Sequence, residues 1–222
     1  MTTDEAVAGT TTPPPPAGLR ERKKQRTRSA LVRSALELFT RQGYERTTVD
    51  EIAEAVEVSQ RTFFRYFANK EEVAFASQEA AECHFFAALC GRPAGEAPLA
   101  ALRGAILGAW GSIGEAIEQL VSPELHMRMY RVIESTPSLL AVHLRRTAEM
   151  EERLAREIAR REGLDIDADP RPRLVVAMFG GVIRVAGKLW TEGEEDSVVT
   201  LRDLTAFHLD YVGPTLAEKW DK

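Results

Sequence analysis

Helix start and stop signals follow one another closely near the N-terminus, and they limit this part of the chain to short helices joined by tight turns. Gly43 stands at the end of an amphipathic segment, where glycine commonly terminates a helix. Thr48 and Glu51 match the capping-box pattern, which satisfies free backbone amides of a first helical turn. Ser59 and Asn69 can each cap a further helix. Three helices therefore fit into about fifty residues, and the second and third have helix-turn-helix spacing.

The rest of the chain keeps helical periodicity. Breaks rich in glycine and proline divide it into amphipathic segments at about 70–90, 98–120, 123–135, 138–162, 170–191 and 197–212. Sustained period-two alternation is missing from the sequence, which predicts an all-α fold. Cys83 and Cys90 lie on one predicted helix, too far apart to bridge within it, and we expect them to be reduced and buried.

Composition divides the chain into three parts. Residues 1–18 contain four consecutive prolines and few apolar side chains, so we expect a disordered tail. Residues 19–70 form the predicted three-helix unit, and residues 71–222 a larger helical domain. No apolar run reaches the roughly 18 residues that span a membrane, and the N-terminus lacks a secretory signal pattern. The expected location is the cytoplasm.

Charge is distributed unevenly along the chain. Residues 19–70 carry 12 Lys and Arg against 7 Asp and Glu, a balance of +5, so the remainder of a chain with net charge −5 carries −10. The segment from Arg20 to Arg28 alone has six cations and one anion. A basic N-terminal part in an otherwise acidic protein indicates that this end of the molecule binds a polyanion.

The helix that begins after Ser59 combines apolar and hydrogen-bonding faces. Phe63 and Phe67 are four residues apart and face one side, where they can pack on the two preceding helices. Other faces and flanks carry amide, guanidinium, hydroxyl and aromatic groups, from Gln60, Arg61, Thr62, Phe64, Arg65 and Tyr66. Such groups suit base edges in a DNA major groove. Taken alone, the pattern also fits a helix that does not bind nucleic acid, with aromatic side chains in the core and arginines in solvent.

The stretch from Thr47 to Val73, TTVDEIAEAVEVSQRTFFRYFANKEEV, resembles the DNA-binding domain of the TetR family of transcriptional regulators. The resemblance implies a homodimer with one recognition helix per subunit, and a C-terminal helical domain that binds a small ligand and dimerises. Carried over by position, the DNA-binding residues are Thr48, Gln60, Arg61, Thr62, Phe64, Arg65, Tyr66 and Lys70. The chain departs from the family pattern at Glu57, where the turn usually has glycine, and at Asp50. If the turn needs a positive φ, Glu57 bears a strain of about 1–2 kcal/mol.

The C-terminal part offers weaker signals. The segment from Leu174 to Trp190 is apolar nearly all round, which fits a dimeric four-helix bundle or a monomeric core helix. The ligand-binding candidates are rings, methionines and arginines on the middle helices: Phe86, Arg103, Trp110, Met127, Tyr130, Arg131 and Met178, with Phe85, Met129, Arg184 and Trp190 as further candidates. The segment ELHMRMYRVIESTPSL loosely resembles a regulator subgroup with an acyl-CoA-like ligand-binding domain.

These observations predict a ligand-responsive DNA-binding regulator, a repressor released from a pseudo-palindromic operator by a small hydrophobic effector. The partners are double-stranded DNA, the effector, which the resemblance suggests to be acyl-CoA-like, and a second copy of the chain. We expect no enzyme activity, cofactor or metal, since phosphate-loop, dinucleotide and serine-elbow motifs are missing and the four histidines are scattered. Two alternatives stay open: an all-α protein-interaction adaptor, and a small-molecule enzyme in the C-terminal domain.

Overall fold

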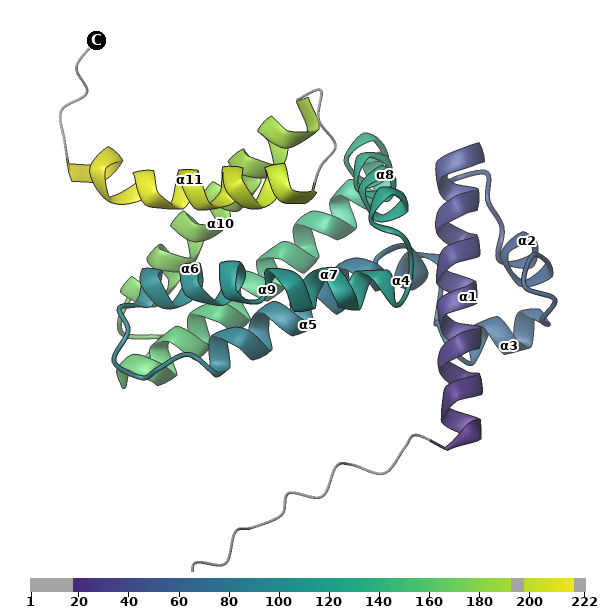
Figure 1. Ribbon diagram of the computed structural model, residues 1–222, viewed down its shortest axis with the longest axis horizontal. Helices are drawn as coiled ribbons and strands as arrows, with labels where there is room; N and C mark the ends of the chain where they lie inside the picture. The colour runs from purple at the N-terminus through teal and green to yellow at the C-terminus, as the bar shows by residue number, and fades with distance from the viewer. Residues whose placement is uncertain (1–17, 193–197, 218–222) are drawn as a thin grey trace, which may run out of the picture.

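The computed structural model describes residues 18–192 and 198–217, and within these ranges it consists of helices and the loops between them (Figure 1). This confirms the all-α prediction. The helices are α1 (Leu19–Gln42), α2 (Val49–Glu54), α3 (Gln60–Phe64), α4 (Lys70–Ala74), α5 (Ala76–Cys90), α6 (Pro98–Gly108), α7 (Trp110–Glu118), α8 (Pro123–Ser135), α9 (Pro137–Glu162), α10 (Arg171–Glu192) and α11 (Val198–Ala217). The predicted tail lies outside the described residues, apart from Gly18.

The predicted caps divide the N-terminal unit as expected. Gly43 ends α1 with a φ of 91°, a value that suits glycine. Thr48 and Glu51 form the capping box: the Thr48 Oγ1 accepts from the Glu51 amide at 3.2 Å, and the Glu51 carboxylate accepts from the Thr48 amide at 2.8 Å. Ser59 caps α3 by accepting from the Thr62 amide at 3.2 Å.

The turn between α2 and α3 is a Schellman motif with an unusual residue. The Val58 amide donates to the Ala53 carbonyl at 3.0 Å, and the Glu57 amide donates to the Glu54 carbonyl at 2.9 Å. This pair of bonds places Glu57 at the position that normally holds glycine, with a φ of 56°. The turn therefore needs the left-handed conformation, and a residue with a side chain adopts it.

Two predicted helices are each divided in the structure. The segment at 70–90 forms α4 and α5, which meet at Phe75 with φ −97° and ψ 2°. The segment at 98–120 forms α6 and α7, which meet at Ala109 with φ −86° and ψ 0°. Neither residue is a helix breaker by itself. The side chain of Phe75 is buried, and a change of helix direction at this point brings its ring into the core.

The expectation that both cysteines are buried is wrong. Cys83 and Cys90 are free thiols on α5, and both are exposed. The buried side of this helix carries Phe85 and Leu89 instead.

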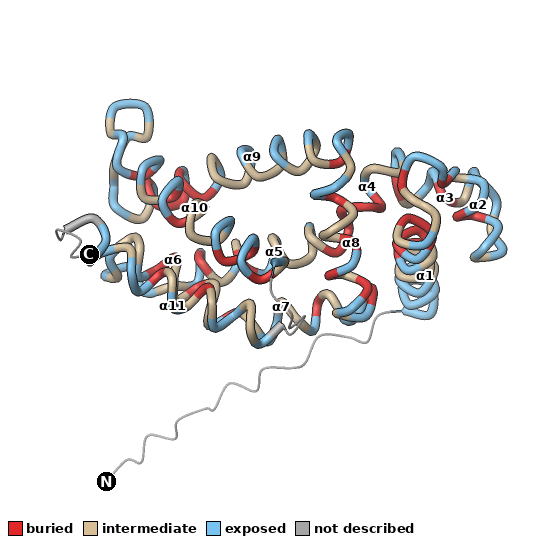
Figure 2. The backbone as a smooth tube through the Cα atoms, turned by 90° about the horizontal axis from the view of Figure 1, so that it is seen from above, coloured by how far each residue is buried: buried red, intermediate tan, exposed pale blue. Residues whose placement is uncertain are grey.

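Buried side chains form two cores (Figure 2). The first joins α1 to α4 with the chain around Leu120, with α8 and with the start of α9. The second joins α5, α6, α9, α10 and α11. The first core contains side chains of α8 as well as of α1 to α4, so α8 packs directly on the N-terminal unit. The predicted domain boundary after residue 70 stays a prediction.

Candidate DNA-binding face and ligand cavity

Helix α3 is anchored by its aromatic side chains. Phe63 is fully buried and Phe67, just after the helix, is 3% exposed. Their ring centroids are 5.7 Å apart, and both rings belong to the core that includes α1 and α2. The back of the helix is therefore fixed against the rest of the N-terminal unit, as the periodicity predicts.

The opposite side of α3 is open to solvent. Gln60, Arg61 and Arg65 are exposed, and Phe64 is 49% exposed. Thr62 and Tyr66 are half-buried at the flank, and the Arg65 guanidinium lies 5.3 Å from the Tyr66 ring centroid. The structure thus brings six of the eight predicted DNA-binding residues together on one short segment. The polar groups among them can donate to base edges and phosphates, and the Phe64 ring can contact a thymine methyl group.

The other two predicted residues have contacts within the protein. Thr48 is exposed, and its hydroxyl donates to the Glu51 carboxylate at 3.0 Å. The Lys70 Nζ donates to the backbone oxygens of Tyr44 and Thr47 at 2.9 and 3.3 Å, and it lies 4.2 Å from the Tyr44 ring centroid. The ammonium of Lys70 therefore holds the start of α4 against the loop before α2.

The basic segment at residues 20–28 is part of α1. The helix begins at Leu19, so these cations project from a regular helix, and most of them are exposed. Helix α1 crosses between the α2–α3 pair on one side and the C-terminal helices on the other (Figure 1).

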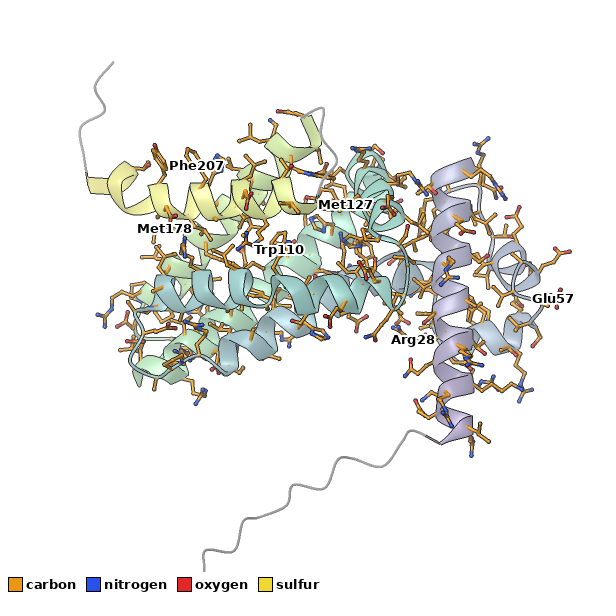
Figure 3. All side chains as sticks on the ribbon, viewed as in Figure 1. Arg28, Glu57, Trp110, Met127, Met178 and Phe207 are labelled. Carbon is orange, nitrogen blue, oxygen red and sulfur yellow. The ribbon has the colours of Figure 1, made fainter. Side chains whose placement is uncertain are left out.

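A cavity of about 400 Å³ lies among the C-terminal helices, a size typical of small-molecule sites. Its walls come from α5, α6, α7, α8, α10 and α11, with His143 from α9. Three predicted ligand-binding residues line it, namely Trp110, Met127 and Tyr130, and so do the further candidates Phe85 and Trp190. Trp110 and Met127 are labelled in Figure 3.

The other predicted ligand-binding residues lie outside the cavity lining. Phe86 is one residue from Phe85 and faces away, with the Arg153 guanidinium 4.6 Å from its ring centroid. Arg103 pairs with Asp210 at 2.8 Å on the surface. The remaining four have other surroundings. Arg131 lies 5.8 Å from the Trp190 ring centroid, and Arg184 pairs with Glu151 at 2.9 Å. Met178 is exposed on α10, and Met129 is buried in the core that α8 shares with α1.

Burial favours the uncharged form of several polar groups in the cavity lining. Burial lowers the pKa of His126 to about 4, and its Nδ1 lies 2.9 Å from the Ser77 Oγ. Burial, with Arg146 nearby, also lowers the pKa of His143. Burial raises the pKa of Tyr130 to about 12. Burial raises the pKa of Glu82, while Arg146, 3.7 Å away, opposes this shift.

Sequence reasoning missed His126, His143 and Glu82. A signal for His126 is its spacing, because Pro123, His126, Met127 and Tyr130 follow the three- and four-residue steps of one helix face. No such signal marks the other two, which reach the cavity from distant helices. Within the described residues, His, Cys, Asp and Glu side chains form no group of three that could hold a metal ion.

A short helix with a buried aromatic back and an exposed polar front, joined to a helical domain with an apolar cavity, defines a ligand-responsive helix-turn-helix regulator. The comparisons agree: residues 31–76 match the bacterial regulatory proteins of the tetR family, and residues 96–217 match the MftR C-terminal domain. The chain belongs to the TetR family and is a ligand-responsive, DNA-binding transcriptional regulator.

The chain is similar to the HTH-type transcriptional regulator TcmR of Streptomyces glaucescens, with 51% identity over 203 residues that cover 91% of this chain and 90% of that protein. A protein of Mycobacterium tuberculosis named as the mycofactocin biosynthesis transcriptional regulator MftR is 30% identical, over 82% of this chain and 87% of its own. Among solved structures, the SmeT–triclosan complex shares the fold, with a TM-score of 0.59 and 17% identity; the match covers 89% of this chain and 100% of that one.

Proposed function

We propose that this chain is a homodimeric repressor, that it binds a pseudo-palindromic operator through α3, and that an uncharged hydrophobic ligand in the cavity releases it. The observation that carries the proposal is the division of α3 into a buried back and an exposed front. The front presents two guanidinium groups, an amide and an aromatic ring without any carboxylate. In a dimer, two such helices would enter successive major grooves about one DNA turn apart.

DNA binding is tested by selection from a random DNA library, followed by titration of the selected duplex. We expect an inverted repeat to be enriched. Replacing Arg61 by alanine should weaken binding about tenfold or more, because a bidentate arginine–guanine pair contributes about 1–3 kcal/mol. Arg145→Ala is the matched control, since Arg145 is an exposed arginine on α9, away from α3. Selection of a site without repeat symmetry, or equal binding by the Arg61 and Arg145 variants, would contradict the proposal.

The proposed dimer interface is the exposed apolar face of α10 and α11. Its described residues recur at helical spacing and are Leu174, Met178, Val185, Leu189, Val199, Phe207 and Tyr211. Phe207 is 56% exposed, and Figure 3 shows it on the outer side of α11. An exposed apolar patch on this scale marks an interaction surface, and two copies could bury it against each other.

The oligomeric state is tested by sedimentation or light scattering. The chain of 24.7 kDa should migrate with twice this mass, and Phe207→Glu should shift it toward the monomer. Because Phe207 is exposed in the single chain, this substitution should not unfold it. A monomeric wild-type protein, or a Phe207→Glu variant that dimerises equally well, would refute this interface.

The cavity lining supports an uncharged ligand rather than an acyl-CoA. Among the described residues that line it, none is lysine or arginine, whereas two are glutamates, Glu82 and Glu118. The phosphates of a coenzyme A group would therefore meet negative and neutral groups. Aromatic and aliphatic walls with a few hydrogen-bonding side chains favour a compact, neutral, apolar molecule.

Ligand binding is tested with Nile red, an uncharged apolar dye, in a fluorescence titration. Gly114 lines the cavity and has open space around it, so Gly114→Leu should fill part of the volume and weaken dye binding. Gly111→Leu is the matched control on the same helix, because Gly111 is exposed and does not line the cavity. Equal dye binding by both variants, or preferential displacement of the dye by lauroyl-CoA over uncharged compounds, would contradict the assignment.

A cytoplasmic location follows from the proposed role on DNA. Helix α10 is long and apolar enough to cross a membrane by length and composition alone. Its contacts with α6, α9 and α11, together with the proposed dimer interface, account for this apolar character without a membrane.

A further inference from the structure

A second hollow separates α1 from the C-terminal helices and plays no part in the proposed ligand response. It measures about 720 Å³ and is lined by the middle of α1, by α5 and by the end of α7 with the residues that follow it. We refer to this hollow as the interdomain crevice. None of its described lining residues comes from α2 or α3, so it is separate from the exposed front of α3.

The α1 wall of the crevice is built from a single helix face. Arg26 and Arg33 are seven residues apart, which is two helical turns or about 10 Å along the axis. Between them on the same face lie Ser29 and Ala30, whose small side chains leave open space. Arg28 also lines the crevice and is labelled in Figure 3; its guanidinium lies 5.2 Å from the Phe67 ring centroid. The wall therefore carries three guanidinium groups, and the small side chains of Ser29 and Ala30 lie between those of Arg26 and Arg33.

The opposite wall adds hydrogen-bonding groups and no negative charge. His84 comes from α5 and Gln119 from the end of α7, and alanines fill much of the rest. All twelve described lining residues lack a carboxylate. Arg26 and Arg33 have no ion pair or side-chain hydrogen bond with any described residue. A guanidinium stays charged at every physiological pH, so the crevice holds permanent positive charge within a protein of net charge −5.

From this arrangement we infer that the interdomain crevice binds a small multivalent anion, one that carries at least two phosphate or carboxylate groups. Arg26 and Arg33 bind its charged groups from α1, while His84 and Gln119 contact it from α5 and α7. Planar guanidinium groups form paired hydrogen bonds to phosphate and carboxylate oxygens. A concave site with charge of one sign also concentrates its counter-ion.

An anion at this position would bridge two parts of the molecule. One wall belongs to the helix that supports α2 and α3, and the other belongs to helices that line the ligand cavity. Because the bound anion contacts both, it would fix the position of α1 relative to α5 and α7. The crevice is thus a second effector site, distinct from the apolar cavity in both place and chemistry.

Isothermal titration calorimetry of the full chain with pyrophosphate and with citrate tests the inference. The two probes distinguish a preference for phosphate from a preference for carboxylate, and binding of either supports the site. We expect one anion per chain and a tenfold or greater loss of affinity in the double variant Arg26→Gln/Arg33→Gln. Both arginines are exposed, so the variant should fold, which circular dichroism checks.

Two control variants separate the crevice from other basic surfaces. Arg61→Gln/Arg65→Gln removes the same charge from the DNA-binding face, and Arg145→Gln removes an exposed arginine from α9. Both should change the anion affinity less than twofold. The inference is overturned if wild-type protein binds neither probe at millimolar concentration, or if the crevice variant binds as well as wild type. An equal or greater loss in the Arg61/Arg65 variant would overturn it as well.

Discussion

The Schellman turn between α2 and α3 allows backbone strain to be measured directly. Glu57 adopts a φ of 56°, and it is the one non-glycine residue with a positive φ among those the structure describes. A left-handed residue with a Cβ costs about 1–2 kcal/mol. The Glu57 side chain is exposed and has no described partner, so no contact offsets this cost.

Replacement of Glu57 by glycine should therefore stabilise the protein. Relief of the left-handed conformation contributes about 1–2 kcal/mol, and the greater freedom of glycine in the unfolded chain removes about 0.5–1 kcal/mol of it. The expected net gain is about 0.5–1 kcal/mol in the free energy of unfolding. For a chain of this length it corresponds to a rise of roughly 1–4 °C in Tm.

Urea unfolding followed by circular dichroism measures the effect, with every variant at the same protein concentration because subunit association also stabilises. Glu57→Ala is the matched control: it removes the same carboxylate but keeps a Cβ at positive φ, so it should change the free energy of unfolding by less than about 0.5 kcal/mol. If the glycine variant is no more stable than the alanine variant, the turn stores no strain at this residue and the reasoning is refuted.

Three further predictions concern residues described above. Lys70→Met should lower the free energy of unfolding by about 1.5–3 kcal/mol in urea titrations, because it removes a charged donor from two backbone oxygens; an unchanged value would show that these bonds contribute nothing. Phe63→Ala should cost about 3–5 kcal/mol and Phe64→Ala less than 1 kcal/mol, since one ring is fully buried and its neighbour is 49% exposed; similar costs would contradict the assigned faces of α3. The pKa of His126 is about 4 in the folded protein and 6.5 in the unfolded chain, so the unfolded chain takes up the proton first as the pH falls. The free energy of unfolding should therefore fall by up to about 3 kcal/mol between pH 6.5 and pH 4. His126→Gln should remove this part of the pH dependence, and an identical pH profile for the variant would show that another group causes it.

Local signals made the N-terminal unit predictable. Thr48, Ser59 and Asn69 act within one helical turn of their partners, so their roles can be inferred from neighbouring residues alone. The faces of α3 follow from its periodicity in the same way. The breaks at Phe75 and Ala109 could not be foreseen, because neither residue disfavours a helix.

The ligand cavity was less predictable for a geometric reason. Its walls come from helices spread over more than a hundred residues of sequence, and a rotation of one residue decides which side chain enters. Phe85 lines the cavity and stacks on Phe179 at 5.6 Å, while Phe86 contacts Arg153 on another face. Composition marks both rings equally, and only the orientation of α5 distinguishes them.

Helix α8 contributes side chains both to the ligand cavity and to the core shared with α1. His126 and Tyr130 line the ligand cavity, while Leu125, Met129 and Ile133 lie in the core shared with α1. A change of effector preference during evolution must therefore alter the side of α8 that lines the cavity. The side that packs on α1 must meanwhile keep its fit to the DNA-binding unit. A genetic screen for mutants that ignore their inducer should recover substitutions on both sides of α8, including positions that never touch the inducer.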